Sequence, residues 1–280
     1  MPQILLEPYS IYYELRGELH LPKLLFLHGF MGRGADFAAI VDALYPEFCC
    51  LTVDLPGHGR TDVLDPAGYG IGALAPALIE VLHRLDFTPC HSIGYSMGGR
   101  LALYLACCFP EAFASVLLES ASPGLETEPE RILRRQQDEI LAVELESGDW
   151  PAFLTRWYER PLFAAIEQSR YFDEMFQRRL DNRPDRLAQA LRGLGAGVQP
   201  SLWDRLPSLN VAISLIAGEL DLKFVQINRR MADRLTFAHL EIVPGCGHAV
   251  RTEHPAAFIV ALKVHLTSAS QSSRSCHPKH

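Results

Sequence analysis

The sequence predicts an α/β fold: a mostly parallel central sheet with helices on both faces and a helical insertion between two of its strands. Three observations favour this class. Short, nearly continuous apolar runs alternate with helical stretches in the first half, a charged segment without strands follows, and apolar runs return in the last third. Strands that are apolar along their whole length and separated by helices are typical of a parallel sheet buried on both faces.

The first half supplies most of the expected elements. Its apolar runs end at turn signals, such as Gly29 after the first run and Pro56-Gly57 after the second. The order strand, helix, strand then favours parallel crossover connections. The expected strands are 24–27, 50–53, 91–95 and 116–118, and the expected helices are 37–45, 73–85 and 97–109.

The middle of the chain predicts a helical insertion. Residues 123–205 contain no convincing strand, and prolines divide them into charged helical stretches. Expected strands at 211–217 and 240–243, and a helix after Pro255, complete the sheet. The predicted helices of the insertion are 130–147, 151–159, 171–181 and 184–192. We expect a core made of 1–122 and 206–266, a helical lid at 123–205, and a disordered polar tail at 267–280.

The composition limits the classes of partner. The chain has 280 residues, 48% of them hydrophobic and 21% charged, with a formal net charge of −7, which repels nucleic acid and anionic membranes. No apolar run approaches the ~18 residues of a membrane span. The N-terminus has no secretory leader pattern, and the cysteines form no CxxC pair. We expect a cytoplasmic monomer that acts on a small molecule, without a nucleic-acid partner or membrane insertion.

The strongest chemical motif is Gly94-Tyr95-Ser96-Met97-Gly98. A G-x-S-x-G pentapeptide alone is common, and its simplest interpretation is a turn that contains a serine. Here an apolar strand precedes it and a helix follows, which is the context that a nucleophile elbow requires. Glycine on both sides lets strand and helix pass closely while the serine occupies a strained turn. We therefore predict Ser96 as the reactive residue.

A serine hydroxyl becomes reactive when a histidine accepts its proton. His248 lies in a glycine-rich loop just after the last expected strand, where the partner of Ser96 belongs. The acid must follow a strand and precede that histidine, and Asp221, after the strand 211–217, meets both demands. Glu219 is the competing acid, and Asp221 taken alone is equally a cap for the helix that follows it.

A reaction that develops an anionic oxygen needs backbone N–H donors aimed at that oxygen. Met97 directly follows Ser96 at the N-terminus of a helix and supplies one N–H. Phe30 follows His28-Gly29 at the end of the first expected strand and supplies the other. We predict that these two amides form an oxyanion hole.

Several motifs together resemble the α/β-hydrolase superfamily over residues 24–265. They are LHGF, DLPGHG, GYSMGG, GELD and GCGH. A narrower resemblance, to the 2-succinyl-6-hydroxy-2,4-cyclohexadiene-1-carboxylate synthases of menaquinone biosynthesis, is carried by SMGGR, SPGL, ER followed by Arg134, WY before PLF, and VQP. Many esterases share the elbow motif, whereas the arginine after Gly-Gly and the motifs of the insertion are more specific.

The narrower resemblance implies a lyase. Such enzymes eliminate pyruvate from 2-succinyl-5-enolpyruvyl-6-hydroxy-3-cyclohexene-1-carboxylate in menaquinone or phylloquinone biosynthesis, by triad-assisted proton abstraction and with no cofactor and no metal. Their substrate carries three carboxylates, which arginine side chains are suited to bind. By motif position, the resemblance implies substrate-binding roles for Arg100, Arg134, Arg179, Tyr95, Trp157, Tyr158 and His28.

Other interpretations stay open from the residues alone. Without the resemblance, Arg100 is as readily a helix-surface residue as a ligand, and Arg134 and Arg179 are solvated by default. Trp157 and Tyr158 would then form the core of the insertion. A carboxylesterase or a carbon–carbon bond hydrolase would use the same triad, and a hydrolase-fold receptor could keep it without turnover.

Overall fold

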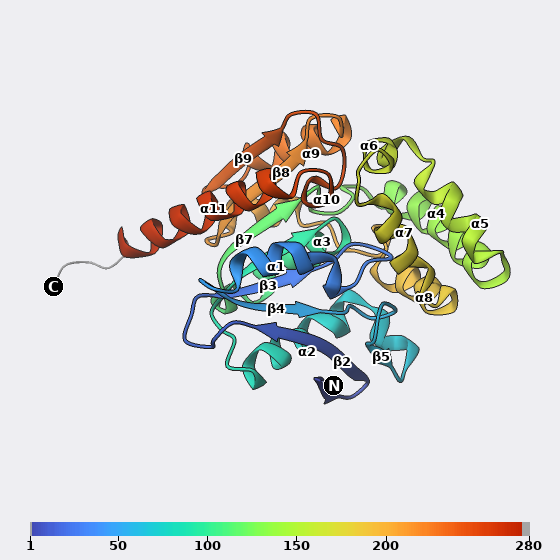
Figure 1. Ribbon diagram of the computed structural model, residues 1–280, viewed down its shortest axis with the longest axis horizontal. Coiled ribbons are helices and arrows are strands. Elements are labelled where there is room, and N and C mark those ends of the chain that lie inside the picture. The colour runs from blue at the N-terminus through green and yellow to red at the C-terminus, as the bar shows by residue number, and fades with distance from the viewer. Residues whose placement is uncertain (1, 276–280) are drawn as a thin grey trace.

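Within residues 2–275, which the computed structural model describes with side chains to residue 269, nine strands form one sheet (Figure 1). They are β1 (Gln3–Leu6), β2 (Tyr9–Arg16), β3 (Lys23–Leu27), β4 (Cys49–Val53), β5 (Asp62–Val63), β6 (Cys90–Tyr95), β7 (Phe113–Glu119), β8 (Ala212–Gly218) and β9 (Ala238–Val243). The sheet order is β1-β2-β4-β3-β6-β7-β8-β9, with β5 beside β2. All pairs from β4 to β9 are parallel, and those of β2 are antiparallel. The predicted mostly parallel sheet is confirmed.

The strand order reverses between β3 and β6, and this reversal positions the site. The chain runs from β3 outward to β4 and then returns past β3 to β6, which pairs with β3 so that Leu27 lies opposite Gly94. Open α/β sheets form a ligand crevice where the connections from two adjacent strand ends leave in opposite directions. The segments that follow these two strands contain Phe30 and Ser96.

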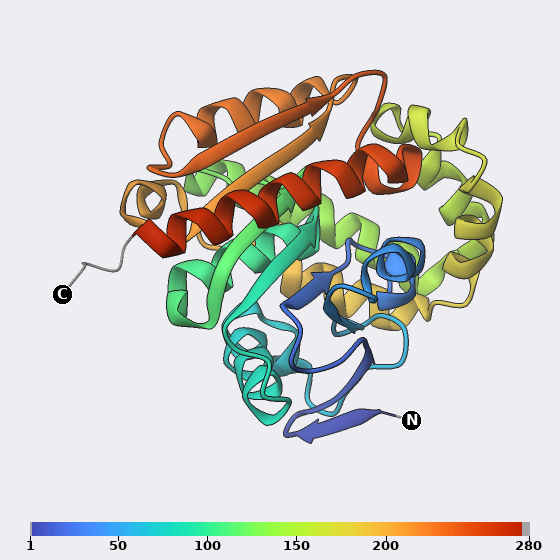
Figure 2. The same cartoon turned by 60° about the vertical axis from the view of Figure 1, so that its left-hand side comes forward.

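Helices cover both faces of the sheet (Figure 2). Their bounds are α1 (Ala38–Leu44), α2 (Ile71–Arg84), α3 (Met97–Cys108), α9 (Leu222–Ala232), α10 (Val250–Glu253) and α11 (Pro255–Ser275). The side chains of β3 alternate between two cores because successive residues of a strand face opposite sides. Leu25 and Leu27 join the core under α2, α3 and α9, whereas Leu24 and Phe26 join the core under α1 and α11.

The chain between β7 and β8 forms helices and no strand. These inserted helices are α4 (Glu128–Ser147), α5 (Trp150–Tyr158), α6 (Ala164–Glu167), α7 (Phe172–Leu180) and α8 (Pro184–Leu194). They group at one end of the sheet, beyond the carboxyl ends of the parallel strands (Figure 1). Capping explains where α4 begins: Thr127 and Glu130 each bond the other's backbone N–H. Asp149 caps α5 in a similar way.

The last helix, α11, continues beyond the point where the sequence predicted disorder. It ends at Ser275, so residues 267–275 of the expected disordered tail are helical, while residues 276–280 lie outside the described part of the chain. Leu262, Leu266 and Ala269 are all buried, so the apolar face of the helix extends past residue 266. None of the helices within residues 2–275 is both long and apolar enough to cross a membrane.

Hydrogen bonds between polar side chains connect α11 to the sheet. Nδ1 of His265 lies 2.7 Å from Oγ of Ser214 on β8, and its Nε2 lies 2.8 Å from Oγ of Ser115 on β7. His91 on β6 contacts the same Ser115 hydroxyl at 2.7 Å. Buried polar groups destabilise a fold unless they are hydrogen-bonded. These hydrogen bonds therefore fix how α11 crosses the strands.

The glycines that flank the turn from β6 to α3 have no space for a Cβ atom. A Cβ on Gly98 would lie 2.1 Å from the carbonyl oxygen of Leu27, and one on Gly94 would lie 2.5 Å from Cα of Gly99. Only glycine permits backbones to approach so closely. The first turn of α3 is consequently held directly against the end of β3.

Replacing Gly98 by alanine should destabilise the fold. The added Cβ would overlap the carbonyl oxygens of Leu27 and His28, at 2.1 and 2.5 Å. Overpacking of this kind lowers the free energy of unfolding by about 1–3 kcal/mol or more, which urea denaturation measures. Gly72→Ala is the matched control, because a Cβ there meets nothing within 4 Å. It should change stability by less than about 1 kcal/mol, and equal stabilities of the two variants would contradict the prediction.

Acidification should destabilise the protein through His265. Burial, with smaller contributions from the nearby His91 and His239, lowers the pKa of His265 from 6.5 to about 3. The unfolded chain takes up this proton near pH 6.5 and the folded chain only near pH 3. The stabilisation is therefore present above pH 6.5 and is lost as the pH falls through that window. Between pH 7 and pH 5, the loss from this residue is about 2 kcal/mol.

Urea denaturation at both pH values tests this expectation. His265→Gln should be less stable than the wild type at pH 7, but its difference between the two pH values should be smaller by about 2 kcal/mol. His20→Gln is the control, because the His20 side chain is 73% exposed and its replacement should leave the difference unchanged. An unaltered pH dependence in His265→Gln would show that the residue is not responsible.

Candidate active site

Ser96 occupies a strained turn between β6 and α3. Its φ of 50° and ψ of −108° lie outside the regions that residues with a side chain favour. Two backbone hydrogen bonds hold the turn: the Ser96 N–H donates to the carbonyl of Glu119 at 2.8 Å, and the Arg100 N–H donates to the carbonyl of Ser96 at 2.9 Å. Ser96 lines a cavity at this edge of the sheet.

His248 joins Ser96 to Asp221 in one hydrogen-bonded row. Nδ1 of His248 lies 2.6 Å from Oδ2 of Asp221, and Nε2 lies 3.1 Å from Oγ of Ser96. A carboxylate only accepts, so Nδ1–H donates to Asp221 and the Ser96 hydroxyl donates to Nε2. The rings of Tyr95 and Phe224 lie against the buried imidazole, with centroids 5.5 and 4.8 Å away. This arrangement can move a proton from Ser96 to His248 and stabilise the resulting imidazolium.

Asp221 makes two kinds of contact, and Glu219 lies apart from the row. Besides His248, the Asp221 carboxylate accepts a hydrogen bond from the N–H of Phe224 at 3.4 Å, at the start of α9. The capping interpretation and the partner interpretation therefore both describe this residue. The exposed Glu219 accepts from the N–H of Gly245 at 3.0 Å. Of the two acids left in competition by the sequence, the structure brings Asp221 to the imidazole.

Phe30 and Met97 place two backbone N–H groups at the cavity near Ser96. Met97 begins α3, and a helix leaves its first N–H groups without internal acceptors. The loop before Phe30 comes close to the serine, since a Cβ on Gly29 would lie 3.6 Å from Cβ of Ser96. Within the described chain, neither N–H donates to a protein acceptor. Both residues line the cavity, so an oxygen atom of a bound molecule can accept from them.

The row opens into a cavity of about 800 Å³, a volume suited to a small molecule. The aromatic residues predicted from the sequence lie in its wall: Tyr95 from the sheet, and Trp157 and Tyr158 from α5. The Trp157 ring packs on Phe30, with centroids 5.6 Å apart. Nowhere among the described residues do three His, Cys, Asp or Glu side chains gather in a group that could hold a metal ion.

The structure places His28, predicted to contact the substrate, outside the cavity wall. The His28 side chain is fully buried and is absent from the cavity wall. Its Nε2 accepts from the N–H of Leu55 at 2.9 Å, so Nδ1 carries the proton and donates to the carbonyl of Gly29 at 2.8 Å. Burial lowers the pKa of His28 well below its usual value. The ring supports the loop backbone as a neutral group.

Arg100 lines the cavity without a carboxylate partner in the described part of the chain. Its Nη1 donates to Oε1 of Gln199 at 2.7 Å, and its Nη2 donates to the carbonyl of Leu194 at 2.8 Å. Burial, with a smaller contribution from the neighbouring Arg134, lowers the pKa of Arg100 to about 10. A cation in these surroundings is stabilised by an incoming anion.

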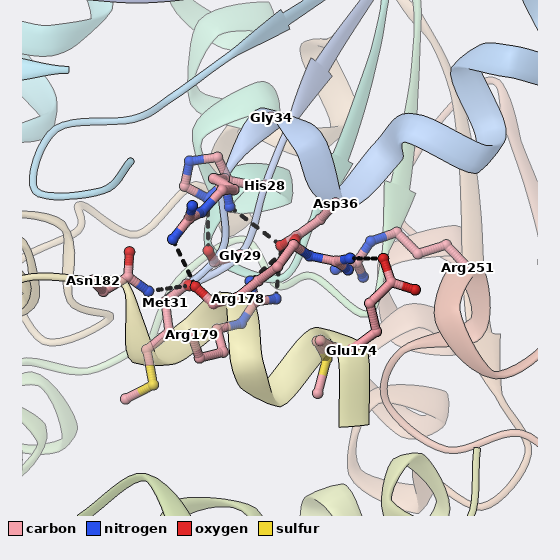
Figure 3. Close-up of polar contacts among 12 residues, drawn as sticks. His28, Gly29, Met31, Gly34, Asp36, Glu174, Arg178, Arg179, Asn182 and Arg251 are labelled. Carbon is pink, nitrogen blue, oxygen red and sulfur yellow. Dashed lines mark hydrogen bonds and ion pairs between the residues drawn. The ribbon is translucent and has the colours of Figure 1, made fainter. Parts of the chain in front are cut away.

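Arg134 and Arg179 also line the cavity, but each is paired with an aspartate. Nε of Arg134 lies 2.7 Å from Oδ1 of Asp138. Arg179 makes two bonds with Asp36: Nη1 to Oδ1 at 3.0 Å and Nη2 to Oδ2 at 2.7 Å (Figure 3). Burial opposes the Arg179 charge, but Asp36 outweighs burial and raises the pKa of Arg179. Both arginines keep only part of their donors for a bound carboxylate.

Arg251 and Glu119 form a buried ion pair that the sequence analysis did not single out. The Arg251 N–H donates to Oε1 of Glu119 at 2.9 Å, and its Nη1 lies 3.4 Å from Oε2. The guanidinium of Arg251 lies 3.5 Å from the centroid of the Tyr95 ring and lines the cavity. Burial raises the pKa of Glu119 to about 7, against the opposing effect of Arg251. A glutamate at the end of an apolar run was the available signal.

Two further cations of the cavity wall were also missed. Arg160 lies over the Trp157 ring, 4.1 Å from its centroid, and Lys223 lies 5.7 Å from the centroid of the Phe224 ring. Neither forms an ion pair with a described carboxylate, in contrast to Arg230, which pairs with Glu126. Without a motif to mark them, both look like ordinary surface residues in the sequence.

Comparison with known proteins extends this description. The alpha/beta hydrolase family matches residues 24–262. A Bacillus subtilis (strain 168) protein, provisionally named 2-succinyl-6-hydroxy-2,4-cyclohexadiene-1-carboxylate synthase, is 37% identical over 86% of this chain and 89% of its own length. The enzyme of that name from Escherichia coli O1:K1 is 32% identical over 88% of this chain and 94% of its own.

A solved structure agrees with these sequence relatives. The structure of MenH from S. aureus superposes with a TM-score of 0.87 and 29% identity, covering 95% of this chain and all of that one. The predicted fold class is thereby confirmed. The chain belongs to the α/β-hydrolase family and, within it, to the 2-succinyl-6-hydroxy-2,4-cyclohexadiene-1-carboxylate synthases.

Proposed function

We propose that this chain is a lyase that eliminates pyruvate from 2-succinyl-5-enolpyruvyl-6-hydroxy-3-cyclohexene-1-carboxylate, a step of menaquinone or phylloquinone biosynthesis. The product is 2-succinyl-6-hydroxy-2,4-cyclohexadiene-1-carboxylate. The observation that carries the proposal is Arg100, which lines the same cavity as Ser96 and His248 and has no carboxylate partner in the described chain. A substrate with three carboxylates needs such a cation, whereas a neutral ester does not. Family membership supports the same reaction.

The hydrogen-bonded row acts as a proton acceptor in this reaction. His248 takes the hydroxyl proton of Ser96, and Oγ of Ser96 removes a proton from the ring carbon α to the succinyl ketone. The electron pair of that C–H bond forms a double bond from the ring carbon to the ketone carbon, and the ketone oxygen takes up the negative charge of an enolate. The N–H groups of Phe30 and Met97 stabilise this enolate oxygen.

Elimination then completes the reaction without water. The ketone re-forms as the enolate electron pair makes a double bond from the α carbon to its ring neighbour. The existing ring double bond shifts one position along the ring, and the bond between the ring and the enolpyruvyl oxygen breaks. The proton held by the row returns to the leaving group, which tautomerises to pyruvate. Every group involved comes from one copy of the chain, so we propose that a monomer is sufficient. We also propose that the enzyme acts in the cytoplasm.

Carboxylate recognition falls to the cations of the cavity wall. Each substrate carboxylate buried without a partner costs about 1–3 kcal/mol or more. Arg100 offers a planar pair of donors, and Arg134 and Arg179 add donors from the inserted helices, which we propose to act as a lid. The aromatic wall packs on the substrate ring; its members are Tyr95, Trp157 and Tyr158.

The wild-type chain should release pyruvate from the enolpyruvyl substrate, and loss of any member of the row should stop that release. Ser96→Ala removes the proton acceptor, and His248→Ala removes its base. Each change should lower kcat by at least about 100-fold, and the double variant should be little worse because the residues act as a unit. An assay coupled to lactate dehydrogenase measures pyruvate directly.

The two acids provide the control for this experiment. Asp221→Ala should resemble His248→Ala, whereas Glu219→Ala should keep kcat within about threefold, because the Glu219 carboxylate contacts the N–H of Gly245. Equal losses would overturn our choice of acid. Rapid hydrolysis of neutral esters without any pyruvate release would reject the lyase and favour a hydrolase.

Substituting Arg100 should impair capture of the anionic substrate. Arg100→Ala leaves a substrate carboxylate unpaired and should lower kcat/KM by roughly 10- to 1000-fold, equivalent to ~1.4–4 kcal/mol. Arg100→Lys should restore only part, because an ammonium cannot form the bidentate pair. Slow cleavage of an uncharged ester should be nearly unaffected by either change.

The control is an arginine on the far surface. Arg84 pairs with Glu80 on the exposed side of α2, so Arg84→Ala should match the wild type. Higher ionic strength should also weaken substrate capture by the wild type more than by Arg100→Ala. If Arg100→Ala turned over the enolpyruvyl substrate as efficiently as Arg84→Ala, the assigned role of Arg100 would be wrong.

A further inference from the structure

We propose that Asp36 is a positioning residue: it ties the oxyanion loop (residues 28–36) to helix α7 of the inserted helices and so holds the N–H of Phe30 beside Ser96. This inference rests on the proposed function for the role of that N–H. Asp36 was not among the residues singled out by the sequence. It does not touch the Ser96–His248–Asp221 row and does not itself line the cavity, although its partner Arg179 does.

The Asp36 carboxylate holds its own loop and the inserted helices at once. Both of its oxygens bond the guanidinium of Arg179, and both side chains are only 4% exposed (Figure 3). Oδ1 also lies 3.5 Å from Nε of Arg178, and Oδ2 accepts from the backbone N–H of Arg33 at 3.2 Å. One buried carboxylate thus joins the end of α7 to the loop backbone.

Further bonds cross at the same place. The Asn182 side-chain amide donates to the carbonyl of Met31 at 2.8 Å (Figure 3). Nη2 of Arg33 donates to the carbonyl of Arg178 at 2.6 Å. Nη1 of Arg33 also lies 3.4 Å from Asp181. The contacts come from one turn of chain at the end of α7 and meet the loop on both sides of Gly32.

The loop needs this external support. Met31 has a φ of 62°, a left-handed conformation that residues with a side chain rarely adopt without contacts that enforce it. A Cβ on Gly32 would lie 2.8 Å from the carbonyl oxygen of Gly29 and 2.9 Å from Oδ2 of Asp36. The Asp36 carboxylate therefore lies directly against the tight turn that follows Phe30.

Only the peptide unit between Phe30 and Met31 separates these contacts from the N–H group of Phe30. Phe30 lies between Gly29, which approaches Ser96, and Met31, whose carbonyl is bonded to Asn182. An oxyanion donor is effective only within about 2.7–3.1 Å of the oxygen that it stabilises. A shift of the Met31 peptide therefore moves the donor out of range while Ser96 and His248 stay in place.

An ionised carboxylate is suited to this position. Burial by itself would raise the pKa of Asp36, but Arg179 and, with a smaller effect, Arg251 outweigh burial and hold the pKa below its usual range. The surrounding arginines thus favour the ionised form of the Asp36 carboxyl group. A buried ion pair contributes little net stability, and its best-attested use is to select one geometry.

Asp36→Asn tests the proposal, because asparagine keeps the shape of the side chain and loses its charge. In protein shown to be folded at the assay temperature, kcat for pyruvate release should fall roughly 10- to 100-fold with KM within about threefold, since an oxyanion donor acts in the transition state. Asn182→Ala removes only the bond to Met31 and should lower kcat in the same manner, by about 2- to 10-fold.

A destabilised but remote variant is the control. Leu82→Ala opens space in the core on the far face of the sheet and should lower the melting temperature while leaving kcat of the folded protein unchanged. If Asp36→Asn and Asn182→Ala lower only the melting temperature, or raise KM with kcat intact, the positioning role is overturned. Should Asp36→Asn fail to fold, Asn182→Ala still decides by the same criteria.

Slow hydrolysis of p-nitrophenyl acetate separates this proposal from the proposed function. Ester cleavage also develops an oxyanion beside Ser96 and uses the same N–H of Phe30. If the wild type released no pyruvate, the lyase would be rejected. A fall of ester-cleaving kcat in Asp36→Asn, with no fall in Leu82→Ala, would still support the positioning role, and unchanged ester cleavage in Asp36→Asn would refute it.

Discussion

Parallel pairing of β3 with β6, at the point where the strand order reverses, is the constraint on which the site depends. Leu27 lies opposite Gly94, so the two strands end together and their following loops meet. Because β7, β8 and β9 continue the sheet in parallel, their ends deliver Glu119, Asp221 and His248 to the same edge. A slip of one residue in the β3–β6 register would turn the side chains of one strand to the opposite face of the sheet and would separate the Phe30 N–H from Ser96.

The cations of the cavity wall fall into two groups, those paired with a carboxylate and those without such a partner. Four guanidinium groups are matched with acids and so have a fixed geometry: Arg134 with Asp138, Arg179 with Asp36, Arg230 with Glu126, and Arg251 with Glu119. Cations gathered in an empty cavity repel one another, and pairing limits that repulsion. The remaining positive potential comes from side chains without a described carboxylate partner, which are Arg100, Arg160 and Lys223. Selectivity for anions should therefore depend on these three.

The strands and the residues at their ends could be predicted from the sequence, whereas contacts between residues far apart in the chain could not. Apolar runs predicted β3, β4 and β6 to β9 within a few residues, because a strand buried on both faces is apolar throughout. β2 was missed since its burial alternates irregularly and its last residues meet solvent. Ser96 and its partners follow from strand ends, whereas Asp36 and Arg179, 143 residues apart, meet only through the tertiary fold. The sequence also does not reveal that the loop turns the His28 ring inward, toward Leu55.

Positive φ angles occur at Ser96 itself, with φ of 50°, and at Met31, with φ of 62°, in the loop that carries Phe30. Such conformations cost about 1–3 kcal/mol each and persist only where the surroundings enforce them. The carbonyl of Glu119 enforces the first from the neighbouring strand, and the side chain of Asn182 enforces the second from beyond α7. The inserted helices thus supply part of the backbone support of the site, so their removal would disturb the chemistry as well as expose the cavity.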